Sequence, residues 1–259
     1  MSLETIEMEK FYDRLPICLS LIGFRRSGKS LAAAKIIQYL VNRGAFKRII
    51  LFLGSDRCNP ELVSLVKKRF DERLIFNKMS EEILMKIIEQ QRELREISED
   101  NSCLLVFDDI YTSQLRHAVA LNKLFQSGRH FNCSIITSCV SWSDIAPSCR
   151  RSLDFVILYS NITLSDTQFL TRNFLNKNLI QTARYALKTN RLYTGLVIQT
   201  SPEQKLYLLK FKKKGLDHKN TDLENTARSS KNDCLETKSL EQVDENGSEE
   251  PTEKKILEI

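Results

Sequence analysis

The segment GFRRSGKS carries the residue types and spacing of a phosphate-binding loop. It satisfies G-x-x-x-x-G-K-[ST], in which the glycines allow a tight turn and backbone N–H groups surround nucleotide phosphates at a helix N-terminus. We therefore assign nucleotide contact to the whole loop: Gly23, Phe24, Arg25, Arg26, Ser27, Gly28, Lys29 and Ser30. Lys29 is expected to reach the β- and γ-phosphates of ATP, and the Ser30 hydroxyl to bind a Mg²⁺ ion that bridges them. Arg25 and Arg26 could face the nucleotide, a neighbouring subunit or solvent.

Two adjacent carboxylates, Asp108 and Asp109, follow the apolar run CLLVF further along the chain. In phosphate-loop ATPases, one carboxylate at such a strand end orders the Mg²⁺ hydration shell, and a second can polarise the attacking water. We assign Asp108 to the metal and Asp109 to the water. Because aspartate is one methylene shorter than glutamate, we hypothesise that hydrolysis depends on an arrangement that only an assembled oligomer provides.

The segments around these motifs alternate short β-type runs with longer amphipathic ones, which is typical of βα units around a parallel sheet. The run CLSLI leads directly into the loop, and SLAAAKIIQYL leads directly out of it. We predict an α/β fold with a mostly parallel central sheet, helices on its faces and a terminal β-hairpin. The predicted strands are Ile17–Gly23, Arg48–Gly54, Leu74–Phe76, Cys103–Asp108, Ser134–Ser138, Phe155–Tyr159, Tyr193–Gln199 and Leu206–Phe211. The predicted helices are Gly28–Asn42, Pro60–Phe70 with Asn59 as N-cap, Ser80–Ser98, Ser113–Ser127, Ser165–Phe174 and Leu179–Lys188.

Charge and composition divide the chain into three parts. Residues 1–15 are an N-terminal extension, 16–213 are the ATPase domain, and 214–259 are an acidic tail that we expect to be disordered because it lacks aromatic residues and a sustained apolar period. The tail holds 12 acidic and 7 basic residues, so the rest of the chain is strongly basic. A basic surface favours a polyanion such as nucleic acid as partner, and it equally favours solubility.

The cysteines and the hydropathy indicate the kind of cellular compartment in which the protein is expected. The seven cysteines are odd in number and form no C-x-x-C pair, so we expect reduced core thiols in a non-oxidising compartment rather than a zinc site or disulfides. No apolar run approaches the length of a membrane span, so we do not expect an integral membrane protein.

Three further segments narrow the family: GRHFNCSII after the acidic pair, Arg150 ahead of Ser152 and Asp154, and LIQTAR from Leu179. With the two motifs above, and in this order over residues 16–200, the sequence resembles the genome-packaging ATPases of poxviruses and other nucleocytoplasmic large DNA viruses, a branch of the FtsK/HerA superfamily. The resemblance implies a RecA-like P-loop NTPase core and a ring-shaped homo-oligomer, expected to be a hexamer. It also implies ATP-driven movement of double-stranded DNA into a preformed capsid.

The same resemblance implies partners and a place of action. Capsid or membrane-vertex proteins of the virus are the expected protein partners. The host cytoplasm or a viral assembly site is the expected location, with association with the virion as a further expectation. DNA would be held by lysine and arginine contacts to phosphates, for which Lys67, Lys68 and Arg69, or the run from Lys212 to Lys214, are candidates that could equally be solvated surface.

Two catalytic assignments stay open. Arg129 and Arg150 are candidates for the positive charge that stabilises the transferring phosphoryl group, within or across subunits, and Arg150 is favoured. Family members carry a γ-phosphate-sensing glutamine where this chain has Val140, and Ser138, Ser141 or Gln114 are possible substitutes. The leading hypothesis is therefore a DNA-stimulated motor ATPase, and the alternative is a nucleotide-binding assembly or regulatory module with weakened turnover. A small-molecule kinase lacks a recognisable acceptor pocket, and a GTPase is disfavoured because no [NT]-K-x-D motif follows the fifth strand.

Overall fold

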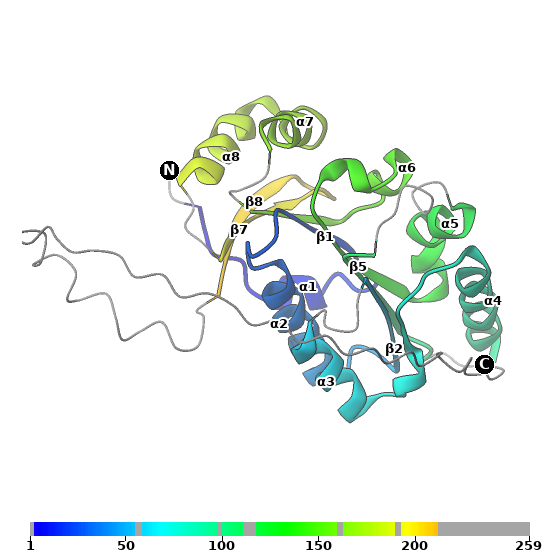
Figure 1. The fold of residues 1–259 in the computed structure, drawn as a ribbon. Coiled ribbons are helices and arrows are strands. Elements are labelled where there is room, and N and C mark those ends of the chain that lie inside the picture. The colour runs from blue at the N-terminus through cyan, green and yellow to red at the C-terminus, as the bar shows by residue number, and fades with distance from the viewer. Residues whose placement is uncertain are drawn as a thin grey trace, which may run out of the picture. The chain divides into compact units, whose positions relative to one another are not determined.

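The central element is an eight-stranded sheet with the order β3-β2-β4-β5-β1-β6-β7-β8 (Figure 1). The structure, a computed structural model, describes residues 3–54, 59–97, 100–110, 118–159, 163–189 and 193–211. The strands are β1 (Cys18–Ile22), β2 (Arg48–Leu53), β3 (Ile75–Phe76), β4 (Cys103–Asp108), β5 (Cys133–Cys139), β6 (Phe155–Tyr159), β7 (Thr194–Gln199) and β8 (Lys205–Lys210). Strands β1 to β6 are parallel, and β7 and β8 form an antiparallel hairpin beside β6. This is the predicted fold class, and the predicted strands are confirmed.

Helices cover both faces of the sheet. One face carries α1 (Glu9–Tyr12), α2 (Lys29–Asn42) and α3 (Pro60–Arg69), and the other carries α4 (Glu81–Ile97), α5 (Val119–Ser127), α6 (Pro147–Arg150), α7 (Leu164–Phe174) and α8 (Lys177–Thr189) (Figure 1). Short 3₁₀ turns are η1 (Glu72–Leu74), η3 (Gly128–Phe131) and η4 (Trp142–Asp144). Alternate residues of each central strand supply the two cores, as the period of two in a strand requires. In β4, Leu104 and Val106 face α2, while Leu105 and Phe107 face α4 and α5.

The N-terminal residues pack on the domain. The Ile6 amide donates to Leu208 O at 2.8 Å, and the Leu208 amide donates to Glu4 O at 2.8 Å, so this segment extends the sheet beside β8. Phe11 is fully buried and its ring meets that of Phe155 edge-on at 4.9 Å. This cover protects an edge strand that would otherwise present unpaired backbone groups.

Several predicted boundaries depend on caps that the structure shows directly. The Ser80 hydroxyl accepts from the Ile83 amide at 3.2 Å, which confirms Ser80 as the cap of α4. Asn59 occupies the N-cap position of α3, as predicted, and its side chain makes no cap hydrogen bond there. Helices α1 and α6 were not predicted because four residues are too few for a 3.6-residue period to show.

Some predicted segments include residues that the structure does not describe. The first turns of the helix predicted from Ser113, the end of the Ser80 helix at Ser98 and the acidic tail lie outside the described residues. Among the residues that are described, no helix has both the length and the apolar character needed to cross a membrane.

Candidate active site

The phosphate loop leaves the carboxyl end of β1 and ends where α2 begins at Lys29. Arg26 and Gly28 both adopt left-handed backbone conformations, with φ of 64° and 106°, which curl the loop back on itself. The Lys29 side chain is only 5% exposed, and Nζ donates to Gly23 O at 2.6 Å and to Phe24 O at 3.0 Å. Burial lowers the pKa of Lys29, and the carboxylates of Asp109 and Asp108 act in the opposite direction. The loop therefore holds the Lys29 amino group at its centre, against its own carbonyl oxygens.

Strand β5 joins this loop to the acidic pair. It lies between β1 and β4, with Cys139 opposite Ile22 of β1 and Ser138 opposite Asp108 of β4. The Gly23 amide donates to Cys139 O at 3.2 Å, and the Asp109 amide donates to Ser138 O at 3.3 Å. Because all three strands are parallel, their carboxyl ends meet at one edge of the sheet. Lys29, Asp108 and the end of β5 thus belong to one site.

Buried polar atoms at this edge fit a phosphate and a metal ion. Asp108 Oδ1, Ser138 Oγ and Ser27 Oγ are buried and form no hydrogen bond of good geometry with any described residue. Buried polar atoms without a partner are rare in folded proteins and usually mark a ligand or water. A carboxylate and hydroxyls beside a loop amide cradle are the donor set that Mg²⁺ and phosphate prefer. The residues predicted to hold Mg²⁺, Ser30 and Asp108, fit that ion by their chemistry.

The protonation of Asp108 is set by its surroundings. Burial raises the pKa of this carboxyl, and the nearby negative charge of Asp109 raises it further. The hydroxyl of Ser138, the amide of Asn59 and the ammonium of Lys29 lower it. A bound cation would favour the charged form, because an opposite charge offsets the cost of desolvation.

Asp109 turns away from the strand into solvent. Its φ of 52° is left-handed, and the residue is exposed. It lines a cavity of about 130 Å³ together with Arg25, Ser138, Cys139, Val140 and Asp144. This cavity lies at the carboxyl ends of β4 and β5, which is the place expected for an attacking water. Val140, at the position of the family's glutamine, supplies an apolar side chain there.

Three residues were candidates to replace that glutamine: Ser138, Ser141 and Gln114. The structure places the two serines differently. Ser138 lies at the end of β5 beside Asp108, with its hydroxyl buried. The Ser141 hydroxyl accepts from the Ser143 amide at 3.3 Å and caps η4 in a reciprocal box with Asp144. Gln114 lies outside the described residues. Ser138 is therefore the described candidate whose hydroxyl is placed for the site.

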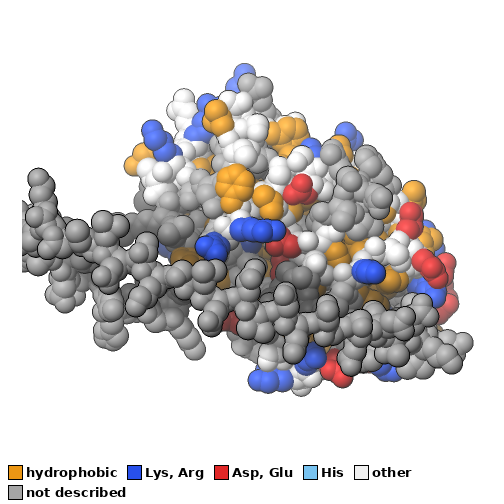
Figure 2. Space-filling view, in the orientation of Figure 1, with side chains coloured by type: hydrophobic (Ala, Val, Ile, Leu, Met, Phe, Trp, Pro, Cys, Tyr) orange, Lys and Arg blue, Asp and Glu red, His pale blue; other side chains and the backbone are white. Residues whose placement is uncertain are grey.

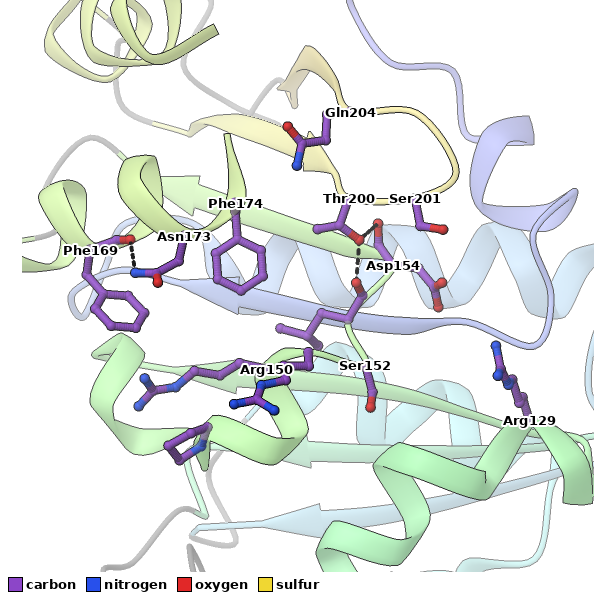
Figure 3. Close-up of a pocket in the computed structure, with 13 residues that line it drawn as sticks. Arg129, Arg150, Ser152, Asp154, Phe169, Asn173, Phe174, Thr200, Ser201 and Gln204 are labelled. Atoms are coloured by element: carbon purple, nitrogen blue, oxygen red, sulfur yellow. Dashed lines mark hydrogen bonds between the residues drawn. The ribbon is translucent and has the colours of Figure 1, made fainter. Parts of the chain in front are cut away.

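Arg129 and Arg150 do not join this site within one chain. Arg129 lies in η3, directly before β5, so it stands at the amino edge of the parallel strands, opposite the phosphate loop. The seven residues of β5 separate the two edges by about 20 Å at the usual rise per residue. Both arginines line a second cavity of about 540 Å³, together with Asp154, whose amide donates to Cys18 O at the start of β1 (Figure 3). Figure 3 shows Arg129 on the far side of this pocket from Phe169 and Asn173.

The favoured arginine, Arg150, is built into the core. It is 8% exposed, and its Nε donates to Ile145 O at 2.6 Å. Its guanidinium carbon lies 5.3 Å from the ring centre of Trp142 and 5.0 Å from that of Phe169. Arg129, by contrast, is exposed. Of the two, Arg129 is the one that a neighbouring molecule can reach.

The family model of the poxvirus A32 protein matches residues 8–201, which is most of the chain. The chain belongs to the poxvirus A32 family. The family expected from the motifs is confirmed, and with it the P-loop NTPase architecture. No curated protein matches the sequence significantly.

Solved structures share the fold of this A32-family chain at low identity. The genome packaging NTPase B204 of Sulfolobus turreted icosahedral virus 2, in complex with AMPPCP, aligns with a TM-score of 0.57 and 14% identity over 76% of this chain and 98% of its own. A second structure, of B204, the DNA-packaging ATPase from Sulfolobus turreted icosahedral virus, aligns with a TM-score of 0.57 and 15% identity. The alignment covers 76% of this chain and 99% of B204. Two ATPase domains of Thermomonospora curvata EccC align with a TM-score of 0.51 and 14% identity over 78% of this chain and 38% of theirs.

Asn59 is a site residue that the sequence did not reveal in this A32-family chain. It is 8% exposed with a left-handed φ of 46°, and its amide nitrogen donates to Ser30 O at 3.2 Å. Its amide also lowers the pKa of Asp108. β2 is the neighbour of β4, and Gly54 at the end of β2 lies against Asp109, so residues that follow β2 can reach the end of the acidic strand. In the sequence, an asparagine before Pro60 predicts a helix cap. No sequence signal distinguishes that role from contact with Ser30 and Asp108.

Replacing Asn59 with glycine is expected to weaken Mg²⁺-nucleotide binding about tenfold, because a hydrogen bond to a charged group is worth that much. Glycine accepts the left-handed conformation, so the change removes the amide without adding backbone strain. Titration calorimetry with Mg²⁺-ATP measures the effect. Asn132→Gly is the matched control, since Asn132 is also left-handed, with φ of 56°, and lies at the opposite edge before β5. Equal affinities in the two variants would contradict the assignment.

Arg150→Met is expected to reduce stability rather than chemistry. A desolvated cation–π contact contributes about 2 kcal/mol, which corresponds to a loss of roughly 4–8 °C in Tm for a domain of this size. Thermal unfolding of Arg150→Met and of Arg151→Met checks this, because Arg151 lines the same cavity but is exposed. Unchanged Tm in Arg150→Met, with turnover lost, would instead support a direct catalytic role for Arg150.

Proposed function

We propose that this chain hydrolyses ATP in a Mg²⁺-dependent reaction and uses it to move double-stranded viral DNA into a preformed capsid. The observation that carries the ATPase proposal is the convergence of Lys29 Nζ with the buried oxygens of Asp108 and Ser138 at one edge of the sheet. Packaging is supported by membership of the A32 family and by the shared fold with NTPases whose names describe genome packaging.

The described side chains divide the work of phosphoryl transfer. Lys29 and the loop amides hold the β- and γ-phosphates and stabilise the charge that grows on them. Ser30 and Asp108 would hold Mg²⁺, which neutralises phosphate charge when bound. Asp109 orients the water in the cavity at the end of β4 and accepts its proton. The Ser138 hydroxyl donates a hydrogen bond to the terminal phosphate, a contact that the apolar side chain of Val140 cannot make.

The arginine that stabilises the transferring phosphoryl group comes from a second subunit. Arg129 is exposed at the edge opposite its own phosphate loop, so it can reach only a nucleotide held by another copy. A head-to-tail ring brings such opposite surfaces together at every interface. This supports the proposed homo-oligomer and agrees with the hypothesis that the short Asp109 depends on assembly.

Mixing two inactive variants tests this arrangement. Arg129→Ala is expected to lower turnover by about 10³-fold or more while nucleotide binding persists. Lys29→Ala is expected to be impaired for a different reason, loss of the phosphate-binding lysine, so rings assembled from both variants contain interfaces with one intact loop and one intact Arg129. Turnover should therefore return on mixing, measured as phosphate release at equal total protein. Full activity of Arg129→Ala alone, or no recovery in mixed rings of confirmed size, would contradict a role across subunits.

DNA is the proposed substrate of the motor. Figure 2 shows lysine and arginine side chains at several separate places on one face rather than in a single patch, and Lys67, Lys68 and Arg69 form the last turn of α3. Such contacts would bind phosphates without sequence preference and weaken with salt. The run from Lys212 to Lys214 lies outside the described residues. Capsid or membrane-vertex proteins as partners, a hexameric ring, and the host cytoplasm, a viral assembly site or the virion as location belong to the same proposal.

The decisive experiment is steady-state ATP hydrolysis with and without linear double-stranded DNA, across protein concentration. A motor should show turnover that rises with DNA and with concentration and that disappears in Asp109→Asn. The alternative is a nucleotide-binding assembly or regulatory module, which Val140 favours because its side chain cannot form a hydrogen bond with the γ-phosphate. Tight ATP binding without turnover under all conditions would support that module and overturn the motor.

A further inference from the structure

Two tyrosines, Tyr159 and Tyr193, lie against Gly28, the last glycine of the phosphate loop. Tyr159 is the last residue of β6, and Tyr193 directly precedes β7. A Cβ placed on Gly28 would lie 2.9 Å from Tyr193 Cδ1, 3.4 Å from Tyr193 Cα and 3.6 Å from Tyr159 Cε1. Glycine at this position therefore lets both aromatic residues touch the loop where α2 begins.

The surrounding residues hold these tyrosines in place. A Cβ on Gly195 would lie 2.6 Å from Ile157 Cγ2 and 3.4 Å from Tyr159 Cζ, so a second glycine leaves room for the Tyr159 ring. Tyr159 is 2% exposed, whereas Tyr193 is half-buried. Tyr193 has a φ of 63°, which is unusual for a bulky side chain. Such backbone strain persists where the surroundings enforce it, and it concentrates at ligand sites.

The strand order shows which end of a nucleotide would lie near Tyr193. Asp108, Asp109 and Ser138, which act on the terminal phosphate, lie at the ends of β4 and β5, on one side of β1. Strands β6 and β7 lie on the other side of β1. The phosphates lie across the loop between these sides, so the nucleoside leaves the loop toward β6 and β7. This step rests on the proposed nucleotide function.

We propose that Tyr193, which lies with Tyr159 against Gly28, is the platform on which the purine base of the nucleotide stacks. A ring face attracts any base, because every base has a π-face, and it does not read hydrogen-bonding groups. The site is therefore expected to bind ATP and GTP with similar affinity.

The test compares ATP with a probe that lacks the base. Binding of Mg²⁺-ATP, Mg²⁺-GTP and Mg²⁺-tripolyphosphate is measured for the full chain and for Tyr193→Asn, Tyr193→Phe and Tyr185→Asn. Asparagine tolerates a positive φ, so it removes the ring at little backbone cost. Tyr185 is 68% exposed on α8 and serves as the control for loss of a tyrosine.

Stacking is worth about tenfold in affinity or more, so Tyr193→Asn should weaken ATP and GTP by that factor and leave tripolyphosphate unchanged. Tyr193→Phe and Tyr185→Asn should bind like the unaltered chain. Equal weakening of ATP and tripolyphosphate in Tyr193→Asn would overturn the proposal, because Tyr193 would then only shape the loop. A marked preference of the unaltered chain for ATP over GTP would overturn it as well. Failure of the unaltered chain to bind even tripolyphosphate would instead reject the proposed nucleotide function itself.

Discussion

Lys29→Ala is expected to lower ATP turnover by about 10²–10³-fold, the usual cost of removing one preorganised donor from a site that stabilises developing charge. The structure gives the reason in the placement of Nζ, which is buried and held by Gly23 O and Phe24 O at the centre of the loop. No other described lysine takes part in this site. Phosphate release and nucleotide affinity, measured separately, should both fall.

The control for this change lies on the same helix. Lys35 is in α2, is partly exposed and does not enter the loop, so Lys35→Ala should retain turnover. Thermal unfolding of both variants shows that the domain is folded. Turnover of Lys29→Ala comparable with that of Lys35→Ala would mean that the reaction takes place elsewhere, and it would remove the central assumption about this loop.

Gly54→Ala is expected to lower kcat by about 10²-fold, because a displacement near 1 Å in a catalytic group has an effect of this size. Gly54 directly follows β2, and a Cβ there would lie 2.3 Å from the carbonyl oxygen of Asp109 and 2.9 Å from its carbonyl carbon. Both contacts are with backbone, so Asp109 must move. Its carboxylate would then leave the cavity at the end of β5.

The affinity of Gly54→Ala for Mg²⁺-ATP distinguishes a displaced Asp109 from general disruption of the fold. The phosphate loop follows β1, away from Gly54, so the affinity for Mg²⁺-ATP should change far less than kcat. Gly128→Ala is the matched control, since a Cβ at Gly128 would meet its nearest atoms at 3.5 Å, an ordinary contact distance. If Gly54→Ala keeps its kcat, then Asp109 does not position the water, and the assignment of that residue fails.

The sequence by itself determined the parts of the site that are contiguous in the chain. The loop from Gly23 to Ser30 and the pair Asp108–Asp109 are recognisable because their chemistry depends on local spacing and on an apolar strand directly before each. The same local periodicity located the strands and most helices. The cap at Ser80 was predictable for the same reason, since a cap involves residues three positions apart.

Only the tertiary structure decided which of these segments are neighbours. Apolar periodicity shows which face of a strand is buried, but the order of strands depends on long-range packing that leaves no local pattern. The placement of β5 between β1 and β4 brings Ser138 to Asp108, and the placement of β2 beside β4 brings Asn59 and Gly54 to the acidic pair. Packing also separated the two arginines: Arg150 lies against Trp142 in the core, whereas Arg129 is exposed at the edge of the sheet opposite the phosphate loop.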